Sequence, residues 1–147
     1  MYVPLHYSLL LAAFTLLFIL RVCGQILVVV VDIDFLPPFE QWYSGLLPYS
    51  VLLPIQILII GAMLKIVLDF AKRSGFFITP KPRAAVFIKW FSYVYFFSMG
   101  VRYVITMTLY PELRWFTDTI PIWFHMVLAA FLYTFSHYHL RQGLITS

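Results

Sequence analysis

The chain has 147 residues, of which 63% are hydrophobic and only 11% are charged. An ordinary soluble domain carries about 25% charged residues, so this chain has too few to cover a water-facing surface. The net charge of +4 does not indicate a nucleic-acid-binding protein, because the basic residues gather between hydrophobic segments, as topology determinants do. We therefore expect an integral membrane protein that has no nucleic-acid partner.

Four hydrophobic segments are long enough to cross a bilayer, which takes roughly 20 helical residues. They span about 7–31, 49–70, 84–109 and 120–138, and the stretches between them contain the prolines and charges typical of turns. This pattern predicts an all-α polytopic membrane protein, in which a bundle of four transmembrane helices forms one domain over residues 1–147. Gly61 and Gly100 are expected at helix-packing positions.

The loop charges predict the orientation of the bundle. The middle loop, 71–83, is basic and has no acidic residue, whereas the first and third loops hold every acidic residue of the chain except Asp69. Short basic loops stay on the cytoplasmic side, so we expect both termini to be cytoplasmic. The same pattern favours a bacterial plasma membrane, although it does not distinguish this membrane from that of an organelle.

Arg21 is the most demanding residue, because it lies near the middle of the first span and Gln25 follows it by one turn on the same face. An arginine at a helix centre costs about 2.5–3.5 kcal/mol on insertion scales and therefore needs a partner. The candidates are Glu40 of the first loop, helix carbonyls or tyrosine hydroxyls, a bound anion or lipid headgroup, and an acidic residue of another subunit.

Two further polar residues fall in the outer half of the predicted bundle, namely Arg102 of the third span and His125 of the fourth. Together with Arg21 and Gln25 they predict a cationic pocket that suits a carboxylate, a phosphate headgroup or a quinone carbonyl. The alternative is that these residues only line the inward face of a tightly packed bundle.

At the inner end of the second span, Lys65 and Asp69 are four residues apart and are expected to form an ion pair along one helix face. No metal site is predicted. A haem would need two histidines at one depth on facing helices, and His6 with either His137 or His139 is the weak candidate for such a pair.

The sequence contains no catalytic, cofactor or nucleotide motif, so we expect a protein that is not an enzyme. We expect no bound cofactor other than a lipid or a quinone. The leading interpretation is a non-catalytic accessory or structural subunit of a larger membrane complex, with membrane lipid and other membrane subunits as its partners. The alternative is a lipid-, quinone- or pigment-binding protein that uses the outer pocket. A haem-binding electron carrier is a weaker alternative.

Overall fold

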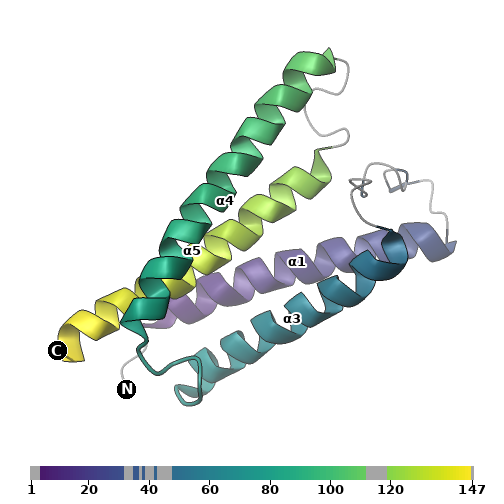
Figure 1. Ribbon diagram of the computed structural model, residues 1–147. Coiled ribbons are helices and arrows are strands. Elements are labelled where there is room, and N and C mark those ends of the chain that lie inside the picture. Colours follow the sequence, from purple (N-terminus) through teal and green to yellow (C-terminus); the bar gives the residue numbers. More distant parts are fainter. Residues whose placement is uncertain are drawn as a thin grey trace.

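A computed structural model of the chain describes residues 4–31, 35–36, 38, 42, 48–111 and 119–146, with side chains through residue 144. This part of the chain forms four helices, α1 (Leu5–Val31), α3 (Tyr49–Lys72), α4 (Pro82–Leu109) and α5 (Ile120–Thr146) (Figure 1). Each helix is long and apolar enough to cross a membrane. The expectation of an all-helical chain with four potential spans is confirmed, as for a small multi-pass membrane protein.

The helices form two hairpins, α1 with α3 and α4 with α5, which meet where α1 packs against α5. Helix α1 packs against α3 and against α5, and α4 packs against α5 (Figure 1). Among these four helices, the backbones of α3 and α4 do not approach one another. The bundle is therefore open between α3 and α4, and α1 and α5 form its centre.

The best-packed region lies where α1 begins, α3 ends, α4 begins and α5 ends, which we call the basic end. Aromatic side chains from three helices meet there: the Tyr138 ring lies 4.6 Å from the Phe70 ring and 5.5 Å from the Tyr7 ring, between centroids. The Tyr138 hydroxyl donates to the carbonyl of Ile78, in the loop between α3 and α4, at 3.4 Å. These contacts hold α1, α3 and α5 together at the basic end.

The helix boundaries differ from the predicted spans most clearly in α5, which continues to Thr146 instead of ending near residue 138. The predicted span stopped where His139 and Arg141 make the sequence polar. Polarity ends a hydrophobic segment but not a helix, and no proline interrupts 138–146. The last two turns of α5 therefore project beyond the apolar segment.

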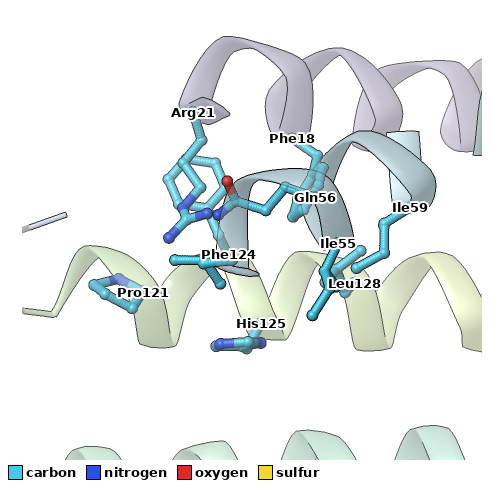
Figure 2. A pocket seen from close by; sticks show the side chains of 10 residues that line it. Phe18, Arg21, Ile55, Gln56, Ile59, Pro121, Phe124, His125 and Leu128 are labelled. Carbon is cyan, nitrogen blue, oxygen red and sulfur yellow. The ribbon is translucent and has the colours of Figure 1, made fainter. Parts of the chain in front are cut away.

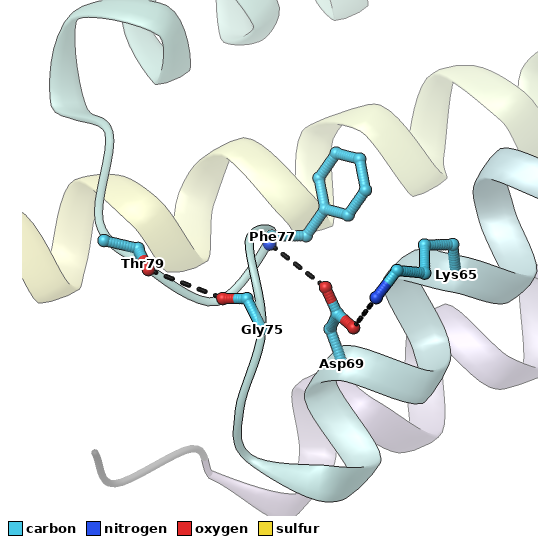
Figure 3. Close-up of polar contacts among 5 residues, drawn as sticks. All are labelled: Lys65, Asp69, Gly75, Phe77 and Thr79. Atoms are coloured by element: carbon cyan, nitrogen blue, oxygen red, sulfur yellow. Dashed lines mark hydrogen bonds and ion pairs between the residues drawn. The ribbon is translucent and has the colours of Figure 1, made fainter.

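Asp69 organises the turn that follows α3 (Figure 3). Its carboxylate pairs with Lys65 and accepts a hydrogen bond from the backbone N–H of Phe77 at 3.2 Å. Arg73 ends the helix in a left-handed conformation, with φ of 54°. Asp69 thus binds both its own helix and the loop that leads to α4.

Gly75 is required at this turn for two reasons. Its φ of 123° is one that side-chain-bearing residues rarely adopt, and a Cβ there would lie 2.4 Å from the Asp69 carboxylate carbon. By contrast, a Cβ at Gly61 or Gly100 would meet no atom within 4 Å. The prediction that Gly61 and Gly100 are packing positions is wrong within this chain, because both glycines face away from its other helices.

We expect Gly75→Ala to lower the free energy of unfolding by about 1–3 kcal/mol, because it combines backbone strain with the displacement of Asp69. Gly61→Ala is the matched control and should be neutral or slightly stabilising, since the position is helical and open. Denaturation in detergent micelles, followed by circular dichroism, measures both. Equal unfolding midpoints for the two variants would contradict this role of Gly75.

Candidate functional site

A cavity of about 180 Å³ lies between α1, α3 and α5, in the half of the molecule opposite the basic end (Figure 2). Its polar lining residues come from three helices: Arg21 from α1, Gln56 from α3 and His125 from α5. The rest of its lining is apolar and consists of Phe18, Leu52, Ile55, Ile59, Pro121, Phe124 and Leu128. We call this space the Arg21 cavity.

The guanidinium of Arg21 is enclosed, since only 7% of the residue is exposed. One terminal nitrogen, Nη2, donates a hydrogen bond to the backbone carbonyl of Trp42 at 3.2 Å, and the group lies 5.7 Å from the centre of the Phe124 ring. Its Nε has no hydrogen-bond partner among the residues that the structure describes. Arg21 therefore retains a buried donor beside the cavity, and the carbonyl and the ring are both uncharged.

Trp42 reaches Arg21 because α1 carries a glycine one turn beyond the arginine. A Cβ on Gly24 would lie 2.7 Å from the Cη2 atom of the Trp42 ring, which is closer than real Cβ atoms approach. Trp42 is itself buried, with 8% of its surface exposed. Trp42 therefore packs against α1 at Gly24.

A second polar contact joins α1 to α3 beside the cavity. The amide Nε2 of Gln56 donates to Oε1 of Gln25 at 3.2 Å, and both side chains are buried. The other amide atoms, Nε2 of Gln25 and Oε1 of Gln56, have no hydrogen-bond partner. The pair thus links two helices while leaving one donor and one acceptor unsatisfied.

His125 joins α5 to α4 on the opposite flank of the cavity. Its Nδ1 is hydrogen-bonded to the hydroxyl of Tyr95, and the two rings meet edge to face at 5.7 Å between centroids. Arg102 lies on α4, half-buried, and it is not among the residues that line the cavity. Of the residues expected to converge in this half, Arg21 and His125 line the cavity directly, and Gln25 adjoins it through Gln56.

The other predicted site residues lie elsewhere. Lys65 and Asp69 form their ion pair at the basic end, remote from the cavity (Figure 3). Glu40, which was a candidate partner for Arg21, falls outside the described residues. Within the described ranges, no three histidine, cysteine or carboxylate side chains gather in a way that could hold a metal ion.

Sequence reasoning missed two of the residues that shape the cavity, Gln56 and Trp42. Gln56 carried a usable signal, because a lone amide inside an apolar span needs a hydrogen-bond partner on another helix. The Trp42 carbonyl carried none, since every residue has one. Chemically, the arrangement offers a guanidinium, an amide and an imidazole on an apolar wall, a set that binds an anion or a hydrogen-bond acceptor.

Comparison of the chain with protein-family models, with curated proteins and with solved structures finds no match.

The pairing of Gln25 with Gln56 can be measured with a double-mutant cycle. Gln56→Leu alone should destabilise the protein, by about 1–2 kcal/mol, because it leaves the Gln25 amide buried without its donor. Gln25→Leu combined with Gln56→Leu should recover most of that loss, since both polar groups are removed together. Unfolding in micelles supplies the four free energies, and strictly additive effects would show that the two amides do not interact.

Proposed function

We propose that this chain is a non-catalytic membrane protein that binds the polar head of an amphiphile, a lipid or a quinone, in the Arg21 cavity. One observation carries the proposal: Arg21 is buried, its Nε has no hydrogen-bond partner in the described part of the chain, and it lines a cavity with an otherwise largely apolar wall. A head that carries a carboxylate, phosphate or carbonyl oxygen would supply the missing acceptor.

Among heads that carry a carboxylate, a phosphate or a carbonyl oxygen, electrostatics favours the acidic ones. A charge removed from water is costly unless an opposite charge or several hydrogen bonds compensate it. The Trp42 carbonyl and the Phe124 ring contribute partial negative charge only, so they leave the net charge of Arg21 in place. A carboxylate or phosphate would neutralise that charge, whereas a quinone carbonyl would satisfy the donor alone.

The volume and the walls of the cavity fit the head of a ligand better than a whole ligand. A water molecule takes up about 30 Å³ in the liquid, so about 180 Å³ accommodates a small polar group with a few attached carbons. Ile55, Ile59 and Leu128 provide aliphatic contacts for those carbons. The remainder of an acyl or isoprenoid chain would extend into the surrounding bilayer.

The test compares Arg21→Gln with Arg102→Gln, two changes that remove the same charge. Arg21→Gln should remove about one equivalent of acidic lipid or quinone per chain from the purified protein, because a charge-assisted hydrogen bond to that molecule is lost. Arg102→Gln should leave that amount unchanged, since Arg102 does not line the cavity. Extraction and mass spectrometry of the purified proteins measure the bound molecules.

Gel filtration and circular dichroism establish that both variants are folded before their contents are compared. If Arg21→Gln retains the wild-type amount of every co-purified molecule, the cavity is not a ligand site. An equal loss from both variants would mean that overall charge, and not the cavity, retains the lipid.

The second candidate function is an accessory subunit of a larger membrane complex. It is supported by the open flank of the bundle, where the backbones of α3 and α4 do not approach each other. Gly61 on α3 and Gly100 on α4 have free space at their Cα atoms, and small residues let helices of different chains approach closely. A helix from another subunit is the occupant that such glycines would admit.

Gly61→Leu tests this second candidate, because it fills the space that a neighbouring helix would need. In mild detergent, it should reduce the recovery of any stoichiometric partner subunit, whereas Ala71→Leu, at another exposed small residue of α3, should not. A wild-type protein that purifies as a monodisperse monomer without a partner would contradict the subunit proposal and leave the ligand proposal unaffected.

A further inference from the structure

The seam between α4 and α5 holds a second polar site, which is separate from the Arg21 cavity and lies at the basic end. There the first turns of α4 run beside the last turns of α5 (Figure 1). A cavity of about 430 Å³ opens between them, and its lining includes Lys89, His137 and Arg141 together with Leu140 and Leu144. We call this space the seam cavity.

The seam cavity carries positive charge without compensation. Lys89 and Arg141 both line it, and Asp69 is the only acidic residue in the part of the chain that the structure describes. The Asp69 carboxylate is already engaged by Lys65 and by the N–H of Phe77. An anion in the seam cavity would therefore meet two cations and no carboxylate of a described side chain.

His137 forms a fixed wall of the seam cavity. Its Nδ1 is hydrogen-bonded to the Tyr7 hydroxyl at 2.8 Å, and its ring stacks on Tyr133 at 5.8 Å between centroids. Gly143 allows the close approach of the two helices at the other side, since a Cβ there would lie 3.2 Å from Cβ of Pro82. The cavity is thus built from packed elements of α1, α4 and α5.

A second, apolar space lies along the same seam, nearer the middle of the helices, and we call it the apolar groove. Its volume is about 220 Å³, and it is lined by Ser92, Tyr93, Phe96, Ala129, Ala130 and Tyr133. Tyr93 and Tyr133 stand between the two spaces, with ring centroids 5.6 Å apart, and the Lys89 ammonium lies 5.9 Å from the Tyr93 ring. At 1.5 Å per helical residue, Phe96 lies about 10 Å deeper than Lys89.

We propose that the α4/α5 seam binds an anionic phospholipid, with its phosphate between Lys89 and Arg141 and one acyl chain in the groove past Tyr93 and Tyr133. A cationic pocket beside the apolar groove matches the two parts of such a lipid in their order and their spacing. Basic pockets between membrane helices are known to hold acidic headgroups. A free phosphate ion would use only the first of the two cavities.

Native mass spectrometry of the delipidated full-length protein in detergent tests the proposal, with phosphatidylglycerol and phosphatidylcholine as probes. Every protein compared carries Arg21→Gln, so that the Arg21 cavity contributes no acidic-lipid site, and this parent protein should bind phosphatidylglycerol in preference to phosphatidylcholine. Lys89→Gln combined with Arg141→Gln should weaken phosphatidylglycerol binding by about tenfold, because two charge-assisted contacts to the phosphate are lost. Lys72→Gln combined with Arg73→Gln removes the same charge from the same end outside the cavity and should have no comparable effect.

A second pair of variants tests whether the apolar groove holds an acyl chain. Ala130→Leu fills the groove and should weaken phosphatidylglycerol binding while both cations stay in place, whereas Ala62→Leu, on the exposed face of α3, should not. Inorganic phosphate at millimolar concentration should not displace the lipid.

Three results would overturn the proposal: equal weakening by the two double variants, unchanged binding in Ala130→Leu, or complete displacement by inorganic phosphate. The Arg21 cavity is altered in the same way in all of these proteins, so failure here is distinguishable from failure of the proposed function.

Discussion

Hydrocarbon offers no hydrogen-bond partner, so a polar side chain inside a membrane helix needs one from the protein or from a bound molecule. In the half of this molecule opposite the basic end, that requirement sets the contacts between helices. Gln25 bonds to Gln56 and joins α1 to α3, while Tyr95 bonds to His125 and joins α4 to α5. Arg21 donates to the Trp42 carbonyl, which lies against α1. Polar pairing therefore adds to the apolar contacts that Phe18 and Val22 make in this half.

At the basic end, apolar packing contributes more of the contacts between helices than polar pairing does. Rings of Tyr7, Phe70 and Tyr138 pack against one another, and the Asp69 carboxylate secures the turn that leads into α4. Away from this packed end, the α4/α5 hairpin diverges from α1 and α3 (Figure 1). The Arg21 cavity is a consequence of this divergence, because it occupies the space between α1, α3 and α5 beyond the aromatic cluster.

Sequence reasoning was strongest for the elements and weakest for their contacts. Four long apolar segments are visible in the sequence because the thickness of a bilayer fixes the length of a span. The rotation of each helix about its axis is not visible in the same way, since α1 and α3 are apolar around most of their circumference. This is why the pairing of Gln56 with Gln25 was missed and why Gly61 was assigned to a packing face that it does not occupy. Arg21 and His125 were identifiable, because a polar residue in a span is costly whichever way it points.

The Arg21 cavity and the seam cavity both present basic side chains to a ligand, but at different depths along the helices. Lys89 and Arg141 lie near the helix ends, where long basic side chains reach the interface, so their charges are tolerated with or without a ligand. Arg21 lies far from both ends of α1 and is almost fully enclosed, and no described residue places a carboxylate beside it. A lipid bound at the seam would exchange with the surrounding leaflet, because Tyr93 and Tyr133 are partly exposed along the groove. An acidic head beside Arg21 would exchange slowly, since leaving would uncover a buried cation in a medium that cannot solvate it.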